Sequence, residues 1–274
     1  MDNPILSTRF TKEYNIRYPF ASAGIGFFGT ADLAIEVNKA GGIGAIGVAM
    51  LYPDQLRAQI REVRKATSYP LHVNFITFLA SEEHIWVCVE EEVAIVSFHW
   101  GHPPQTMIDL LKKANIKIWE QVGSVEDAKR AVGNGVDLII AQGLEGGGHH
   151  YGALPTFVLV PEIIDAVKPA MVLASGGVVT GKQVAAALCL GADGVWVGSR
   201  NEPIIGKATY FGKEFTIRRF SNFLPVPDTD ANVEWMPLIA GQGVGLIKEI
   251  KPAGEIIREM MAEAALTLSA AGTH

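Results

Sequence analysis

The feature that most constrains the fold is an alternation of short apolar runs and helix-length segments in the second half of the chain. Three β-rich runs end at turns of small residues, and they cover residues 137–141, 171–174 and 194–197. This spacing is typical of parallel strands joined by helices, a class in which the chemistry gathers at the carboxyl ends of the strands. The alternation therefore predicts an α/β fold, specifically a (β/α)₈ TIM barrel.

The first half of the chain carries five more strand-like runs, which brings the total to the eight strands of such a barrel. They cover residues 17–23, 42–48, 71–76, 93–98 and 116–122. The main helices are predicted over residues 30–40, 53–67, 157–167, 180–190 and 253–271, with Thr30 and Ser124 as N-cap residues. Because barrels of about 250 residues form one domain, we expect residues 1–274 to be a single domain.

The regular alternation stops after strand 8. The stretch 217–245 contains three prolines and few periodic positions. Long irregular segments in compact domains are usually functional covers or linkers. Phe220, Phe223 and Trp235 are too apolar for a linker, so we expect residues 201–252 to be an irregular insertion that covers a pocket near the barrel mouth.

Composition excludes several classes of protein. Hydrophobic residues make up 49% of the chain and charged residues 19%, which indicates a globular protein with a large core. The net charge of −6 offers no electrostatic footprint for nucleic acid, and no apolar run approaches the roughly 20 residues that span a bilayer. With no secretory signal visible, we expect a cytoplasmic protein, with a homodimer as one possible assembly, and with Cys88 and Cys189 as buried free thiols.

Two glycine turns predict a phosphate site. Ser175-Gly176-Gly177 and Gly198-Ser199 follow strands 7 and 8. Glycine lets the backbone approach a ligand closely and adopt positive φ, so its N–H groups can bind a phosphate. The turn after strand 6 instead carries His149 and His150 on a glycine-rich loop. We therefore expect a phosphate-bearing cofactor beneath a histidine.

Polar residues within the other strands point to the same mouth. Asn74 lies among apolar β-formers, where an unpaired buried amide would cost about 1–3 kcal/mol, so we expect it to face a ligand. His99 and His102 follow strand 4, and both are candidates for the mouth. Strand 5 ends with Glu120 and Gln121.

Taken together, the glycine motifs resemble the nitronate monooxygenase family, whose members are FMN-dependent barrels related to bacterial flavin enoyl-ACP reductases. The resemblance rests on AGGIGAIG, VNF, VSFHWG, AQGLEGGGHHYG, ASGGVVTG, GADGVWVGSR and AGQGVGLI, in this order and spacing along the chain. The chain departs from the family pattern at Gly24-Ile25, at Trp196 and at the HHYG of its histidine loop. The segment 76–94 is also shorter than in many members.

The resemblance implies a role for each matching residue. His149 corresponds to the catalytic histidine, with His150 as the alternative because the HHYG loop has an extra residue. His150, and His99 from its place at the end of strand 4, are also candidates to contact substrate. The residues implied to bind FMN are Ala23, Gly24, Asn74, Gln142, Gly147, Gly148, Gly176, Gly177, Gly198 and Ser199. No metal is expected.

The implied reaction is oxidation of an alkyl nitronate by O₂ to a carbonyl compound and nitrite, with FMN supplying the redox chemistry. A histidine with an ordinary pKa near 6.5 would act as a base or, when protonated, hold the anionic nitro group. Other functions stay open. One is an NAD(P)H-dependent flavin enoyl thioester reductase. The others are a phosphate-binding isomerase or lyase without flavin, and a non-catalytic flavin-binding scaffold.

Overall fold

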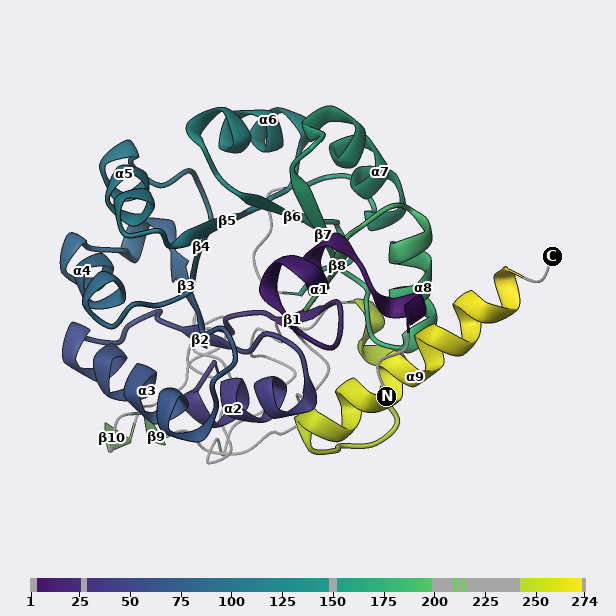
Figure 1. Ribbon diagram of the computed structural model, residues 1–274, viewed down its shortest axis with the longest axis horizontal. Helices are drawn as coiled ribbons and strands as arrows, with labels where there is room; N and C mark the ends of the chain where they lie inside the picture. The colour runs from purple at the N-terminus through teal and green to yellow at the C-terminus, as the bar shows by residue number, and fades with distance from the viewer. Residues whose placement is uncertain are drawn as a thin grey trace.

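A ring of eight parallel strands forms the centre of the molecule (Figure 1). The computed structural model describes residues 4–25, 29–147, 152–198, 209–210, 213–214 and 242–272. The strands are β1 (Phe20–Ser22), β2 (Ala45–Gly47), β3 (His72–Ile76), β4 (Ile95–His99), β5 (Lys117–Val122), β6 (Leu138–Gln142), β7 (Met171–Ser175) and β8 (Gly194–Val197). Their order is β1-β8-β7-β6-β5-β4-β3-β2, which confirms the predicted TIM barrel.

Helices surround the strands. Each gap between successive strands holds one of α2 (Ala31–Ala40), α3 (Pro53–Ala66), α4 (Glu82–Glu90), α5 (Gln105–Lys113), α6 (Val125–Asn134), α7 (Thr156–Val167) and α8 (Gly181–Cys189). The final helix, α9 (Ala253–Ala271), packs on α2 and α8, as expected of a closing helix. The remaining elements are the 3-10 helices η1 (Pro4–Leu6), η3 (Thr77–Leu79) and η5 (Gln242–Leu246), and a separate two-stranded sheet of β9 (Thr209–Tyr210) and β10 (Lys213–Glu214).

Local sequence explains where the helices begin and end. The Thr30 side chain accepts a hydrogen bond from Leu33 N, and the Ser124 side chain accepts one from Asp127 N, so both predicted N-caps are confirmed. Gly41 ends α2 with φ of 107°, a left-handed conformation that glycine adopts at no steric cost.

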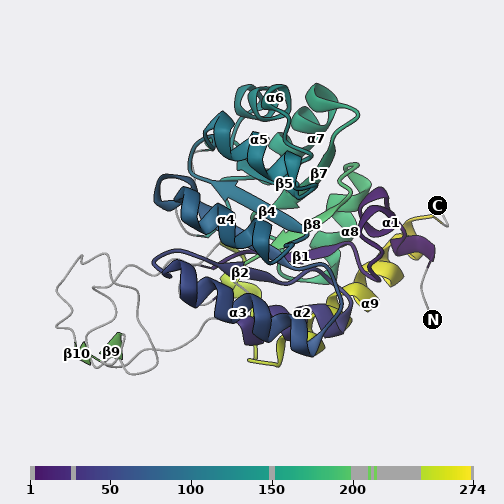
Figure 2. The same ribbon diagram turned by 60° about the vertical axis from the view of Figure 1, so that its left-hand side comes forward.

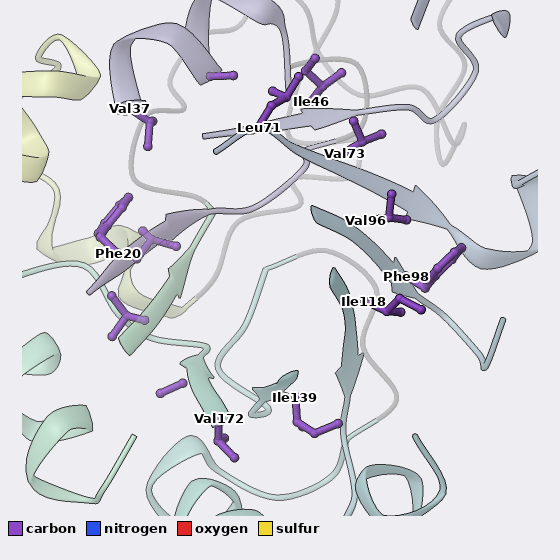
Figure 3. Packing of buried hydrophobic residues seen from close by; sticks show 14 of the residues in the cluster. Phe20, Val37, Ile46, Leu71, Val73, Val96, Phe98, Ile118, Ile139 and Val172 are labelled. Carbon is purple, nitrogen blue, oxygen red and sulfur yellow. The ribbon is translucent and has the colours of Figure 1, made fainter. Parts of the chain in front are cut away.

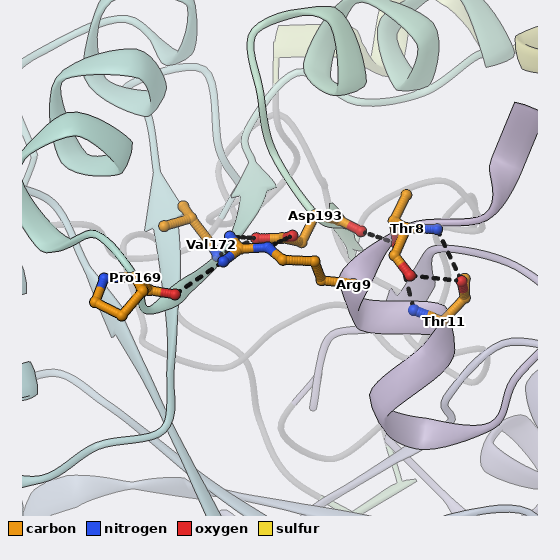
Figure 4. A network of polar contacts seen from close by, with 6 residues as sticks. All are labelled: Thr8, Arg9, Thr11, Pro169, Val172 and Asp193. Atoms are coloured by element: carbon orange, nitrogen blue, oxygen red, sulfur yellow. Dashed lines mark hydrogen bonds and ion pairs between the residues drawn. The ribbon is translucent and has the colours of Figure 1, made fainter.

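Helix α1 (Arg9–Tyr14) closes the amino-terminal end of the barrel, and it lies on the same side of the molecule as the carboxyl end of α9 (Figure 2). Arg9 binds Asp193 through Nε to Oδ1 and Nη2 to Oδ2, both at 2.7 Å (Figure 4). Thr8 Oγ1 donates to the backbone oxygen of Asp193, and Val172 N donates to its Oδ2. This carboxylate therefore ties the N-terminal helix to the strands β7 and β8.

Side chains alternate between two cores, as the period of two in a strand requires. Outward-facing residues such as Val73, Val96 and Ile139 pack against the helices (Figure 3). Inside the barrel, a second cluster includes Trp119 and Trp196, so the tryptophan at position 196 is a core residue.

One expectation is corrected by the structure. Cys88 is buried as predicted, but Cys189 is exposed because it lies at the solvent side of the last turn of α8. The helices α1, α4 and α5 were not predicted. Of the irregular insertion, residues 201–208, 211–212 and 215–241 lie outside the described part of the chain. Within the described ranges, no helix has both the length and the apolar character needed to cross a bilayer.

Candidate active site

A layer of polar side chains lines the barrel interior at the carboxyl ends of the strands. Trp119, Leu138, Ile140 and Leu173 belong to the inner cluster. Because side chains two residues apart share a face of a strand, inward positions toward the mouth hold polar groups on five neighbouring strands, although on β3 Ile76 lies beyond Asn74. These residues are Asn74, His99, Gln121, Gln142 and Ser175.

Two amides of this layer are joined. Gln121 Nε2 donates to Gln142 Oε1 at 2.9 Å, and Gln142 Nε2 lies 3.5 Å from the backbone oxygen of Gly147. Gln142 was predicted as a cofactor contact, whereas Gln121 was noted only as a strand-end residue. Because Gln121 donates to the side-chain oxygen of Gln142, the nitrogen of the Gln142 amide is directed toward the glycine loop.

Asn74 is 3% exposed and donates from Nδ2 to Ser97 Oγ at 2.7 Å. The chain that leaves β1 passes directly against it: a Cβ added at Gly24 would lie 2.3 Å from Asn74 Cβ. Any larger residue at position 24 would displace the Asn74 side chain or the loop. The glycine that departs from the family pattern is therefore required by the position of Asn74.

The turns after β7 and β8 have the geometry expected of a close backbone approach. Gly176 and Gly177 have φ of 99° and 70°, in the region that favours glycine. Among the described residues, a Cβ at Gly177 would meet only the Glu145 side chain, at 3.4 Å, and one at Gly198 only Ala23 Cβ, at 3.6 Å. Gly176, by contrast, is closely packed, since its Cβ would lie 2.7 Å from Thr156 Oγ1.

Glu145 joins the loop after β6 to these turns. Its Oε2 accepts hydrogen bonds from Thr156 N at 2.8 Å and from Thr156 Oγ1 at 2.9 Å, at the start of α7. Thr156 Oγ1 also lies 3.0 Å from the backbone oxygen of Gly176. Sequence reasoning did not single out either residue, because the two partners are eleven positions apart and neither lies in a strand.

His99 is held neutral at the mouth. Burial lowers its pKa to about 4, although a hydrogen bond to the backbone of Phe75 acts in the opposite direction. Its Nδ1 is buried without a hydrogen-bond partner among the described residues. An unpaired buried imidazole nitrogen is costly, so this atom fits a site that a ligand completes.

His102 does not belong to the polar layer at the mouth. Its Nδ1 lies 2.5 Å from Glu120 Oε1, and its Nε2 lies 3.4 Å from Asp127 Oδ1 of α6. Glu120 precedes the inward-facing Gln121, so it faces outward from the barrel toward the helices. Between His99 and His102, Trp100 and Gly101 adopt left-handed conformations, with φ values of 64° and 103°, which the sequence did not reveal.

The predicted site residues that the structure describes lie either within a strand of the barrel or in the loop after its carboxyl end. They are Ala23, Gly24, Asn74, His99, Gln142, Gly147, Gly176, Gly177 and Gly198. Gly148, His149, His150 and Ser199 lie outside the described residues. Within those ranges, no group of three or more His, Cys, Asp or Glu side chains could hold a metal ion.

These features fit a phosphate-bearing ring cofactor. Glycine turns after β7 and β8 suit a phosphate, and the amides of Asn74 and Gln142 suit the polar edge of a flat ring. A flavin combines both groups.

Comparison with known proteins identifies the family. The model of the nitronate monooxygenase family matches residues 7–85 and 77–201. A probable nitronate monooxygenase from Staphylococcus saprophyticus is 32% identical, over 71% of this chain and 67% of its own.

A second relative carries a different name. The (3aS,4S,5R,7aS)-5-hydroxy-7a-methyl-1-oxo-octahydro-1H-indene-4-carboxyl-CoA dehydrogenase of Mycobacterium tuberculosis is 35% identical over 71% of this chain. The match spans only 55% of the length of that dehydrogenase.

Among solved structures, FabK from Thermotoga maritima, as its M276A mutant, superposes with a TM-score of 0.82 at 31% identity. The superposition covers 97% of this chain and 99% of FabK. The chain therefore belongs to the nitronate monooxygenase family of flavin oxidoreductases.

Proposed function

We propose that this chain binds FMN at the barrel mouth and oxidises alkyl nitronates with O₂ to a carbonyl compound and nitrite. The observation that carries the proposal is the pairing of glycine turns after β7 and β8, with positive φ at Gly176 and Gly177, with a polar layer on β3 to β7. Family membership supports the flavin, and the staphylococcal relative's name supports the nitronate.

Each group of residues would have its own task. Gly176, Gly177, Gly198 and Ser199 would bind the phosphate through backbone N–H groups, which approach an anion closely where no Cβ intervenes. The ring would be held by Ala23, Gly24, Asn74, Gln142, Gly147 and Gly148. When bound, the flavin supplies reversible electron transfer, which no amino-acid side chain provides.

The histidines would divide the work on substrate. His149 would act as the base or hold the anionic nitro group, with His150 beside it. His99 is neutral at physiological pH because burial lowers its pKa to about 4, so it would hydrogen-bond substrate without supplying positive charge. A nitronate anion would then depend on His149 for charge compensation.

A second candidate is a flavin enzyme acting on acyl thioesters. The superposition on FabK, an enoyl reductase, covers nearly both whole chains, and the mycobacterial relative is named for a carboxyl-CoA substrate. Exposed apolar side chains follow β2 and β3: Tyr52 is 73% exposed and Phe78 68%, and Phe78 stacks on Trp100. A substrate with a large apolar body would suit this surface better than a small nitronate.

One set of measurements separates these functions. The visible spectrum of the purified protein, before and after adding FMN, tests for the flavin. Nitrite release from ethylnitronate and propionate 3-nitronate in air tests the proposed reaction. Oxidation of NADH or NADPH with crotonyl-CoA, without nitrite, would favour the thioester reductase. A protein that takes up no FMN would favour a phosphate-binding isomerase or lyase, and bound FMN without turnover would indicate a scaffold.

The phosphate turn can be tested by substitution. Gly177→Asp should abolish FMN binding, because a carboxylate would stand against the phosphate at a position with φ of 70°. Gly191→Asp is the matched control, since Gly191 also has positive φ, 94°, but lies between α8 and β8 at the opposite end of the barrel. Fluorescence titration with FMN measures both, and normal binding by Gly177→Asp would exclude this turn as the phosphate site.

The proposed catalytic role of His149 can be tested with a substitution of its neighbour, His150, as the matched control. His149→Ala should retain FMN and lose most of its turnover, whereas His150→Ala should keep both. Bound flavin is read from the absorbance of the purified variants and turnover from nitrite release. Equal turnover in His149→Ala and the unmodified protein would remove the catalytic assignment.

A further inference from the structure

A histidine lies inside the barrel where the proposed function does not use it. His72, on β3, has no exposed surface. Its ring packs between two indoles, with centroids 4.9 Å from Trp119 and 5.0 Å from Trp196. Burial lowers its pKa to about 3, so the ring is neutral at physiological pH and carries one N–H.

This histidine begins a chain of hydrogen bonds that reaches the mouth. His72 Nε2 lies 2.6 Å from Ser97 Oγ, and Ser97 Oγ accepts from Asn74 Nδ2 at 2.7 Å. Ser97 is fully buried and Asn74 is 3% exposed. The chain therefore joins β3 to β4 and back to β3, from the barrel interior to the polar layer.

The direction of the chain depends on which ring nitrogen of His72 carries the proton. A serine hydroxyl has one proton to donate. If His72 donated from Nε2, the Ser97 proton would need another acceptor, and none is present among the described residues. Nδ1 of His72 would also remain as a bare lone pair, since it has no hydrogen-bond partner in the described structure.

The other tautomer satisfies more of these groups. With the proton on Nδ1, Ser97 donates to Nε2 of His72 and accepts from Asn74, so all the polar atoms of Ser97 are used. The Nδ1–H group then lies among indole rings, and an N–H group directed at an aromatic face is weakly favourable. Ser97 can then only accept from Asn74, which prevents the amide of Asn74 from turning over.

We propose that His72, as the Nδ1–H tautomer, acts through Ser97 to fix the Asn74 amide with its nitrogen inward and its carbonyl oxygen toward Gly24 and the mouth. His72, Ser97 and Asn74 together are called the His72 relay below, a term that refers to the chain of hydrogen bonds and not to proton transfer. The oxygen of Asn74 lies 2.5 Å from where a Cβ of Gly24 would stand. Asn74 thus presents an acceptor, which selects an N–H donor on the bound ring. His72 and Ser97 are positioning residues, and the inference rests on the proposed flavin site.

The tautomer can be measured in the protein without added flavin. Correlation of ring nitrogens with ring protons in ¹⁵N-histidine-labelled protein distinguishes Nδ1–H from Nε2–H. The His72 signals are identified by their loss in His72→Phe or, should that variant not fold, by proximity to the indole protons of Trp119 and Trp196. We expect Nδ1–H; a proton on Nε2 would overturn the relay.

A double-mutant cycle tests whether Ser97 acts through Asn74. Ser97→Ala should raise the FMN dissociation constant about tenfold and shift the visible absorption of the bound flavin, and Ser97→Thr, which keeps the hydroxyl, should restore both. In an Asn74→Ala background, Ser97→Ala should have no further effect on FMN affinity, because coupled residues are non-additive. Ile139→Val is the control. It removes a buried methylene on the outer face of β6, so it should lower the stability of the fold without changing FMN affinity or the flavin spectrum.

The outcomes are distinguishable. Additive effects of Asn74→Ala and Ser97→Ala, or a Ser97→Ala variant that matches Ile139→Val in FMN affinity and spectrum, would overturn the positioning role. An unmodified protein that binds no FMN would overturn the proposed function and the positioning role together. The nitrogen correlation would still decide the direction of the hydrogen bonds.

Discussion

At the scale of single residues, Glu120 shows how far burial changes an ordinary carboxyl group. Glu120 belongs to β5, its side chain lies beside His102, and the residue is only 1% exposed. Burial raises its pKa to about 8, the negative charge of Asp127 acts in the same direction, and Arg130 opposes both. The folded protein therefore keeps a proton on Glu120 at pH values where the unfolded chain, with an ordinary carboxyl pKa of 4.5, has lost it.

This difference predicts a pH dependence of stability. Between pH 4.5 and 8 the folded state binds more protons than the unfolded state, so the free energy of unfolding falls as the pH rises, by at most about 1.4 kcal/mol per pH unit. Glu120→Gln, which cannot ionise, should remove this contribution. Urea denaturation at pH 5, 6.5 and 8 measures it, with Glu126→Gln on the exposed side of α6 as control. Parallel pH profiles for Glu120→Gln and the unmodified protein would contradict the assignment.

The candidate site was partly predictable from sequence at this scale. Asn74 was singled out because a polar residue in an apolar strand has few explanations, whereas Gln142 was named only through the family resemblance. Ser97 and Glu145 were missed because their roles come from partners on other strands and loops. His102, one of two candidates for the mouth, lies instead beside Glu120. The left-handed conformations of Trp100 and Gly101 before it could not be predicted, because nothing local requires tryptophan to adopt one.

At the scale of elements, the strands and long helices were predictable, whereas the short helices were not. All eight strands lie within a few residues of their predicted bounds, and α9 has its predicted range of 253–271. Helices α4 and α5 have nine residues each and α1 has six. So few turns give little periodicity, and their stability comes from packing on the barrel.

Helix α6 carries a glycine whose replacement should stabilise the protein. Gly133 lies in its last turn, and an added Cβ would meet nothing within 4 Å. Gly133→Ala should raise the free energy of unfolding by about 0.5–1 kcal/mol, because alanine loses less backbone entropy on folding. Gly44→Ala is the opposite case, because its Cβ would lie 2.2 Å from the backbone oxygen of Ala34. This substitution should lower the free energy of unfolding. Thermal denaturation measures both, and a lowered midpoint for Gly133→Ala would contradict the prediction.

At the scale of the whole molecule, the barrel closes between β1 and β2 through an incomplete strand pair, which we call the β1–β2 seam. Seven of its neighbouring strand pairs have full ladders, but β1 and β2 are joined by the single bridge of Ala21 and Ile43. Beyond this bridge, a side chain takes the place of a backbone acceptor. The buried Ser22 Oγ accepts a hydrogen bond from Ala45 N at 3.0 Å. Sequence showed a strand rich in glycine here, but not that a hydroxyl replaces a backbone partner.

Ser22→Ala should therefore open the ring at this seam. The buried N–H of Ala45 would lose its partner, at a cost of about 1–3 kcal/mol. Hydrogen exchange should accelerate first at Ala45 and its β2 neighbours, because strands without a full ladder open locally before the molecule unfolds. Ser124→Ala, which removes the N-cap of α6 at a cost of about 1 kcal/mol, is the matched control and should leave exchange at Ala45 slow. Unchanged exchange at Ala45 in Ser22→Ala would mean that helices α2 and α9, packed together outside the seam, hold the ring closed without the serine.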